Sequence, residues 1–282
     1  RTSNIGELMI ILGTNSIKAS GFDVDNSCRL DGTSSYMHKT PGSDSNRYTW
    51  TWSGWVKRSS NLAAQQTLFG VSAASASYHL LSFDANASLV HNYEGTHLTT
   101  NARYLDVSAW YHIVLAVDTT QSTDTNRLKL YVNGTQVTSF SNSGYPAEDE
   151  QMNINRTVQH DVGNAGTSYN YYFSGYMAEV VFIDGLALAP TSFGEFDEDS
   201  PTIWKPINVS GLTFGTNGFY LDFKDSANLG NDANGGTDLT EVNLAATDQA
   251  TDSATNNFAT MNFLDNTEGG IATFSEGNCK IL

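Results

Sequence analysis

Apolar and small polar residues alternate along much of the chain, a period of two that is typical of β-strands. The clearest row starts at Tyr48, where Tyr48, Trp50 and Trp52 alternate with threonines until Gly54 interrupts the pattern. A strand here places the three rings on one face, either as the core of a β-sandwich or as a surface that stacks on sugars. Gly54 indicates a bulge or a close approach of the backbone.

Further short strands are expected after this row, separated by Gly, Asn, Asp and Ser turns. The expected strands span residues 67–71, 78–83, 88–93, 110–118, 127–132, 135–140 and 172–183. The pair Asn133-Gly134 predicts a tight hairpin, and only residues 189–194 resemble a turn of helix. Regularly spaced short strands predict an all-β fold, a jelly-roll β-sandwich over residues 20–197 that follows an N-terminal extension, residues 1–19.

The character of the chain changes after Glu195, where an acidic run ends at Pro201. Residues 228–257 are rich in Asn, Asp, Gly and Thr and contain few bulky apolar side chains, so they can bury little surface. We therefore expect an extended, mostly irregular C-terminal tract over residues 198–282, either as a partner-binding arm or as the start of a further β-domain. The chain has no initiating Met and no signal-peptide pattern, which suggests a segment of a longer or processed product.

Charge narrows the range of partners. The 282 residues contain 14 Lys and Arg against 30 Asp and Glu, which gives a net charge of −16. Nucleic acids and anionic membranes require a basic patch, so neither is expected as the main partner. The apolar run at residues 8–12 is too short for membrane insertion. Two cysteines near opposite ends, Cys28 and Cys279, are expected as unpaired thiols, although a bridge between them is the alternative.

Four motifs resemble successive strands of laminin-G-like domains, which have the concanavalin A-like lectin/glucanase jelly roll. They are Trp-Ser-Gly-Trp-Val-Lys at 52–57, Trp-Tyr-His-Ile-Val at 110–114, Leu-Lys-Leu-Tyr-Val-Asn-Gly at 128–134 and Phe-Ser-Gly-Tyr-Met-Ala-Glu-Val at 173–180. Their order follows that of the family over about 180 residues. The resemblance implies a jelly roll that presents a lectin-like surface.

The C-terminal tract resembles a region that follows such domains in virion proteins of tailed, often marine, bacteriophages. Residues 204–207, 215–223, 245–249, 256–260 and 274–278 carry this resemblance. It implies a non-enzymatic virion structural protein on the outer, extracellular surface of the particle: a tail fibre, an appendage or a capsid decoration. Its partners would be other virion subunits and copies of itself, a trimer for a fibre, with host-surface glycans as possible attachment ligands. The alternatives are a secreted carbohydrate-binding or adhesion module and a glycoside hydrolase.

The spacing of the acidic residues argues against a glycoside hydrolase. Retaining glucanases of this fold family usually present Glu-x-Asp-x-x-Glu on one strand, whereas this chain reads Glu179, Val181 and Asp184 at the comparable places. Strand parity puts Glu179 and Asp184 on opposite faces. Glu195 and Glu198 lie in an expected loop. The chain is therefore not expected to be an enzyme, and no cofactor is required.

Aromatic residues beside amides are candidates for binding a glycan, because rings stack on sugar faces and amides bond to hydroxyls. The first candidate set is Tyr169, Tyr171 and Tyr172 beside Asn164, and the second is Tyr93 and His97 with Tyr104. A packed strand face with satisfied hydroxyls is the alternative for the first set.

Calcium is the one metal that the acidic residues suggest, because lectin-like jelly rolls often hold Ca²⁺ on rim loops through carboxylate and carbonyl oxygens. The candidate ligands are Asp222, Asp225, Asp232, Asn234 and Asp238, with Asp23 and Asp25 as a weaker pair. The alternative is that these are solvated loop acids that cap turns.

Overall fold

The computed structural model describes residues 21–59, 64–74, 77–166, 169–258, 274–275 and 280–281. These ranges contain β-strands and three short 3-10 helices, η1 (Asp124–Asn126), η2 (Pro190–Ser192) and η3 (Ala246–Asp248). No helix in them is long and apolar enough to cross a membrane. The predicted all-β class is confirmed, whereas the expected N-terminal extension and Cys279 lie outside the described residues.

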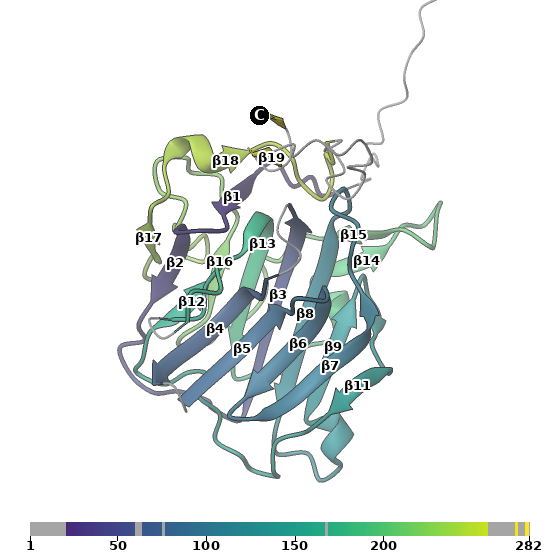
Figure 1. Cartoon of the computed structure of the whole chain (residues 1–282), viewed down its shortest axis with the longest axis vertical. Coiled ribbons are helices and arrows are strands. Elements are labelled where there is room, and N and C mark those ends of the chain that lie inside the picture. The colour runs from purple at the N-terminus through teal and green to yellow at the C-terminus, as the bar shows by residue number, and fades with distance from the viewer. Residues whose placement is uncertain are drawn as a thin grey trace, which may run out of the picture.

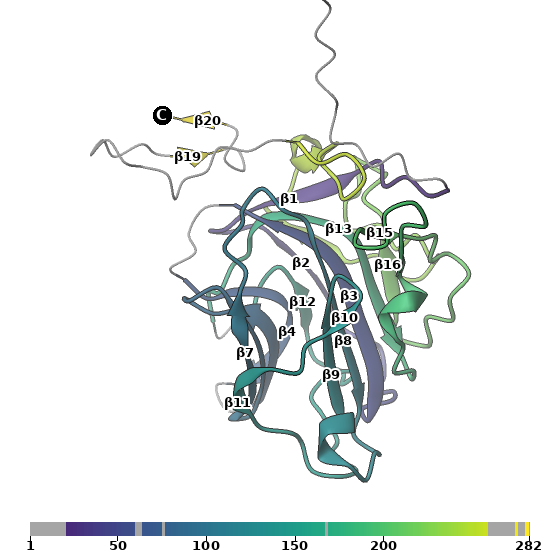
Figure 2. The same ribbon diagram turned by 90° about the vertical axis from the view of Figure 1, so that its right-hand side faces the viewer.

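Two antiparallel sheets of eight strands each stack face to face (Figures 1 and 2). Sheet A runs in the order β10 (Thr135–Gln136), β9 (Leu128–Val132), β8 (Tyr111–Asp118), β3 (Thr49–Arg58), β13 (Ser174–Asp184), β1 (Ser27–Asp31) and β18 (Gln249–Ala250), and β16 (Phe219–Leu221) also pairs with β13. Sheet B runs in the order β11 (Phe140–Ser143), β7 (Thr96–Arg103), β6 (Ser88–Tyr93), β5 (Ser77–Phe83), β4 (Gln66–Ala74), β12 (His160–Val162), β2 (Tyr36–Lys39) and β17 (Thr240–Val242). This is a jelly-roll sandwich.

The main core lies between the sheets and is centred on β3, which pairs with β8 on one side and β13 on the other. Trp50 and Trp52 are both 0% exposed in this core, so their rings fill the sandwich and are not available to stack on a sugar. Thr51 and Ser53, on the opposite face of the same strand, are also buried. Sheet A is therefore covered on both sides at β3.

The irregularity that Gly54 indicated lies in the neighbouring strand. Ala178 and Val181 of β13 pair with Trp55 and Ser53, so β13 bulges opposite Gly54. Gly54 itself stays in register with β8, and a Cβ there would approach the Trp52 ring to 2.7 Å. Glycine is needed at this position because a core indole occupies the space of a side chain.

The Asn133-Gly134 hairpin is confirmed, with φ of 47° and 75° at its two central residues. The strand predicted to follow over residues 135–140 is wrong as a single element. β10 ends at Gln136 in sheet A, and the chain then crosses to sheet B, where β11 starts at Phe140. Crossing between sheets needs a break in the pairing that the period-two pattern does not show.

The tract after residue 197 extends the sandwich. A hairpin of β14 (Gly194–Phe196) and β15 (Trp204–Pro206) spans the predicted boundary, and β16, β17 and β18 add strands to both sheets. Residues up to 258 are described as part of this arrangement, and a further two-stranded pair joins β19 (Phe274–Ser275) to β20 (Lys280–Ile281). The two sheets therefore continue beyond the boundary predicted at residue 197.

Candidate functional site

Five half-buried tyrosines lie over the outer side of sheet B in two groups of contacting rings, and we call them together the tyrosine cluster. Its members are Tyr36, Tyr78, Tyr169, Tyr171 and Tyr172. The Tyr169 and Tyr171 rings stack with centroids 5.2 Å apart and planes 14° apart, and the Tyr78 ring meets Tyr169 edge-on at 6.0 Å. The Tyr172 ring lies 6.1 Å from that of Tyr36 on β2. Of the three tyrosines that the sequence singled out, Tyr169 and Tyr171 thus contact each other, whereas Tyr172 contacts Tyr36.

The backbone around these rings is anchored to the sandwich. The amide of Thr67 donates to the carbonyl of Tyr171 at 2.8 Å, and the amide of Phe173 donates to the carbonyl of Gly163 at 2.9 Å. Phe173 is fully buried in the main core. These bonds fix the backbone on both sides of Tyr172 without help from a ligand, as a preformed site requires.

Asn164 lies beside this segment but faces inward. It is only 3% exposed, and its Nδ2 lies 3.4 Å from the carbonyl of Gly166. The amide of Gly166 donates to the buried carboxyl of Asp161 at 2.6 Å, and burial raises the pKa of Asp161. The Asn164 Oδ1 accepts no hydrogen bond from the described residues. Asn164 therefore shapes the loop below the rings and does not offer its amide at the surface.

The second predicted set is not brought together. Tyr93 is 7% exposed in the main core, where its hydroxyl donates to Glu150 at 3.2 Å and lies 3.3 Å from the carbonyl of Gln151. His97 is half-buried and pairs with Asn92, the neighbour of Tyr93 on β6. Since adjacent strand residues face opposite sides, Tyr93 and His97 belong to different faces of sheet B.

The predicted calcium ligands lie along one region, and their oxygens mostly bind backbone amides. Asp232 is buried and accepts from the amides of Tyr220 and Asn234, at 3.0 and 3.1 Å. Asp238 accepts from the amide of Asp232 and from the Asn228 side chain, while Asp222 and Asp225 cap turns at Lys224 and Ala227. Within the described ranges no three His, Cys, Asp or Glu side chains form a group that could hold a metal. Calcium binding stays a prediction.

Glu179 and Asp184 are both buried and serve different partners. The Tyr220 hydroxyl donates to Glu179 Oε2 at 2.5 Å, and Tyr220 packs in a cluster on the outer face of sheet A. Asp184 accepts from the Asn155 side chain at 2.8 Å and from the amide of Asn217 at 3.1 Å. Burial raises the pKa of Glu179 to about 7. The two carboxyl groups therefore do not share one cleft.

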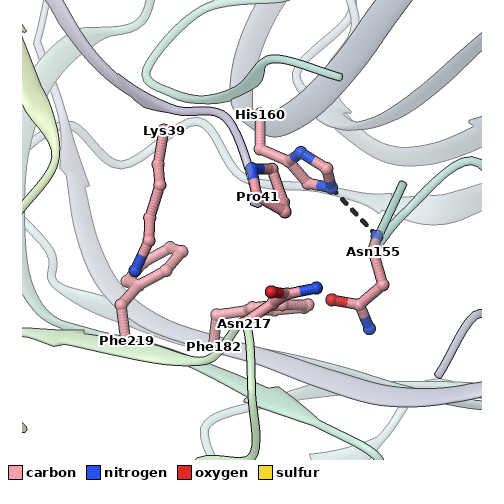
Figure 3. Close-up of a pocket in the computed structure, with 7 residues that line it drawn as sticks. All are labelled: Lys39, Pro41, Asn155, His160, Phe182, Asn217 and Phe219. Atoms are coloured by element: carbon pink, nitrogen blue, oxygen red, sulfur yellow. Dashed lines mark hydrogen bonds between the residues drawn. The ribbon is translucent and has the colours of Figure 1, made fainter. Parts of the chain in front are cut away.

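A small cavity between the sheets contains buried polar groups (Figure 3). It is lined by Lys39, Pro41, Asn155, His160, Phe182, Asn217 and Phe219. The amide of Asn155 donates to His160 Nε2 at 2.9 Å, and burial lowers the pKa of this histidine to about 4. Only about 10 Å³ is open to water, enough for a single water molecule but not for a sugar.

Residues 31–191 match the family Laminin_G_3, described as the concanavalin A-like lectin/glucanases superfamily. The chain belongs to this superfamily. The matched range includes all five residues of the tyrosine cluster and ends before the tract from residue 198 onward. No curated protein matches the chain in sequence.

Solved structures of this lectin/glucanase fold resemble the chain at low identity. A "putative carbohydrate binding protein" from Bacteroides ovatus has a TM-score of 0.51 at 16% identity, over 79% of this chain and 61% of that protein. The heptameric SAP-like pentraxin of Limulus polyphemus has a TM-score of 0.43 at 14% identity, over 60% of this chain and 80% of the pentraxin. Mouse laminin alpha1 domains LG4-5 reach 0.39 at 13%, over 55% and 40% of the two chains. These similarities concern the fold alone.

Tyr36 and Tyr78 are members of the tyrosine cluster that the sequence pattern of this chain does not indicate. Tyr36 lies on β2 and Tyr78 near the start of β5, far from residues 169–172 in the sequence. The available signal was Tyr36-Met37-His38, in which only the middle residue is fully buried and the flanking rings face the other way. Their meeting with Tyr169 and Tyr172 depends on the sheet order β5-β4-β12-β2, which local pattern does not reveal.

Proposed function

We propose that this chain is a non-catalytic carbohydrate-binding module whose sugar ligand binds at the tyrosine cluster. The observation that carries the proposal is the half-buried pair of Tyr169 and Tyr171, stacked at 5.2 Å, with Tyr78 edge-on against Tyr169 and the carbonyl of Tyr171 bound to β4. Aromatic rings offer flat apolar faces to sugar rings, and tyrosine hydroxyls bond to sugar hydroxyls. Membership of the lectin/glucanase superfamily supports this class of ligand.

The absence of catalysis is supported by where the acidic side chains lie. A retaining glycosidase needs two carboxyl groups about 5 Å apart, and an inverting one needs them about 6.5–9.5 Å apart, in both cases across the scissile bond. Glu179 binds Tyr220 on the outer side of sheet A, whereas Asp184 binds Asn155 and Asn217. Neither arrangement supplies a paired acid and base in an open cleft.

The test is a glycan array on the full chain, followed by affinity measurements on the glycan that binds best. Changing Tyr171→Ala removes one stacked ring and is expected to weaken binding about five- to tenfold, in line with the energy of one aromatic contact. Tyr48→Ala, another half-buried tyrosine at the start of sheet A, serves as the control and should leave the affinity unchanged. Equal affinities for wild type and Tyr171→Ala would contradict the proposed site.

We further infer that the module is displayed on the outer surface of a phage virion. The support is the resemblance of the C-terminal tract to phage virion proteins, and many copies on one particle would make weak sugar binding effective through avidity. A near-atomic image of purified particles from the source should show this chain, as a trimer if it forms a fibre. A soluble monomer found in no particle would favour the secreted carbohydrate-binding module instead.

A further inference from the structure

A polar groove opens on the outer face of sheet A, over β8 and β9 and away from the tyrosine cluster on sheet B. Its other boundaries are the turn that contains η1 and residues 187–189, and about 250 Å³ of it is open to water. No residue of the groove belongs to the candidate sugar site or to the predicted calcium ligands.

Small side chains create this groove. Ala116 on β8 pairs with Lys129 on β9, and Val114 pairs with Tyr131, so Lys129 and Tyr131 stand two residues apart on the same face. Ala116 forms part of the lining beside these long side chains, and Ala187 and Ala189 line the groove from residues 187–189. A larger residue at position 116 would fill the space.

Hydrogen bonds hold both walls in place. The buried guanidinium of Arg127 donates to the carbonyls of Gln121, Ser122 and Pro146, at 2.7, 3.0 and 2.9 Å, and so fixes the η1 turn. On the other side, the Thr51 hydroxyl donates to the carbonyl of Leu186 at 2.7 Å and accepts from the amide of Leu188 at 2.8 Å. The groove is therefore formed before any ligand arrives.

Three polar side chains of the groove keep their bonding capacity for a ligand. Within the described part of the chain, the Lys129 ammonium, the Tyr131 hydroxyl and the Asn126 side-chain amide make no hydrogen bond or ion pair with protein. Asp118, the one acidic lining residue, already accepts from Thr120 Oγ1 and Gln121 Nε2, both at 2.6 Å. The Tyr131 hydroxyl is protonated at neutral pH and can donate, and burial raises its pKa further.

We propose that this groove binds a single acidic sugar residue of the hexuronate class. The carboxylate of the sugar pairs with Lys129, its hydroxyls bond to Asn126 and to the Tyr131 hydroxyl, and its apolar ring edge lies over Ala116. The size of the groove supports one ring, because sites for larger ligands run from about 300 to 1,000 Å³. The requirement for a negative charge follows from Lys129, the cation among the groove residues, which is placed on a strand and not on a loop.

This site is separate from the tyrosine cluster, and the proposal goes beyond the proposed function. Separate variants distinguish the two sites, because Tyr171→Ala alters only the tyrosine cluster on sheet B and Lys129→Met alters only the groove on sheet A. If one of the two sites binds no sugar, binding at the other site can still be measured in the same protein.

The experiment is an NMR titration of the full ¹⁵N-labelled chain with sodium glucuronate, with glucose and sodium acetate as matched ligands and calorimetry for affinities. Glucuronate should shift the amides of residues 116–131 and 187–189, whereas glucose and acetate should bind at least tenfold more weakly. Lys129→Met should weaken glucuronate binding tenfold or more, because a charge-assisted bond is lost. Ala116→Leu should have the same effect by filling the groove, which keeps the test independent of one variant.

The control is Lys224→Met, which removes the same charge at an exposed site outside the groove and should leave glucuronate binding unchanged. Equal binding of acetate and glucuronate would overturn the proposal, because the site would recognise a carboxylate without the sugar. No shift at millimolar glucuronate would overturn it too, as would binding that survives both Lys129→Met and Ala116→Leu.

Discussion

The outer faces of the two sheets are used differently. Much of the outer face of sheet A is covered by residues from the chain after β13, which form apolar clusters against it. The outer side of sheet B instead carries the half-buried tyrosine cluster and the exposed hairpin between β6 and β7. Apart from the groove over β8 and β9, the outer face of sheet A is therefore largely buried, whereas sheet B leaves the tyrosine cluster half-exposed on its outer side.

The last part of this covering chain, residues 249–258, is mostly polar, and its contacts with sheet A show how a polar segment can still pack. The fully buried ammonium of Lys57 donates to Asp252 Oδ2, to Asn257 Oδ1 and to the carbonyl of Phe258, at 2.7, 2.8 and 2.7 Å. Trp110 donates its indole N–H to the other oxygen of Asp252 at 2.9 Å. A satisfied buried network replaces the apolar contacts that this segment cannot make.

The largest effect is expected from breaking that network. Lys57→Met leaves the Asp252 carboxylate buried without its cation, which should cost about 3–5 kcal/mol of the free energy of unfolding. Urea unfolding measures this loss. Limited proteolysis should also show faster cleavage within residues 249–258, because the pair joins this segment to β3. The exposed pair Lys224–Asp222 supplies the control, and Lys224→Met should change stability by less than about 1 kcal/mol. Similar losses in the two variants would contradict the role given to Lys57.

A pH-dependent effect is expected on the covered face from His112. Its Nδ1 accepts from the Trp204 indole at 2.9 Å, and its ring stacks on Trp55 at 4.8 Å. Burial lowers the pKa of His112 to about 3, below its value of about 6.5 in an unfolded chain. Between these values the unfolded chain binds one more proton than the folded chain. The free energy of unfolding therefore decreases by about 1.4 kcal/mol for each unit by which the pH is lowered. In urea unfolding, the decrease in the free energy of unfolding between about pH 5.5 and 4.5 should be smaller by about 1.4 kcal/mol in His112→Gln than in the wild type. An unchanged slope would show that His112 does not contribute.

Glu179 should act in the opposite direction. Its folded pKa of about 7 exceeds the ordinary carboxyl value of 4.5, so the folded chain holds the extra proton between these values. The stability from this group is complete below about pH 4.5 and is lost as pH rises toward 7, by about 1 kcal/mol per unit. Glu179→Gln keeps an acceptor for the Tyr220 hydroxyl and should remove this loss. Urea unfolding at about pH 5 and 7 measures it, with Glu198→Gln in the exposed loop as the control. A variant with the wild-type pH dependence would contradict the assignment.

Much of the fold could be predicted from local pattern. The alternation at Trp50 and Trp52 indicates core positions, and Asn133-Gly134 indicates its hairpin, because both depend on neighbours in sequence. The crossing between Gln136 and Phe140 could not be predicted, because it depends on which sheet offers a free edge. Likewise, the polar tract joins the sandwich through Lys57 and Asp252, a contact between residues 195 positions apart.

The candidate sites also divide into those that local sequence predicts and those that it does not. Tyr169 and Tyr171 are two residues apart in sequence, and their rings stack in the structure. Tyr93 and His97 are also close in sequence, but they lie on adjacent strands and face opposite sides of sheet B. Proximity along the chain therefore predicts a shared face only when the parity and the turn between the residues are known.

The smallest effect is expected from calcium. At least one carboxyl oxygen of Asp222, Asp225, Asp232 and Asp238 already accepts a hydrogen bond from a turn, so a cation would compete with these donors, although Asp232 Oδ2 accepts none within the described residues. We expect melting temperatures in millimolar CaCl₂ and in EDTA to agree within about 1 °C. Binding at a hundredfold excess over Kd would add about 2.7 kcal/mol of stability, which corresponds to a rise of several degrees in a chain of this size. Such a rise, abolished by Asp238→Asn but kept in Asp199→Asn, would contradict this expectation and place a calcium site in the tract after residue 197.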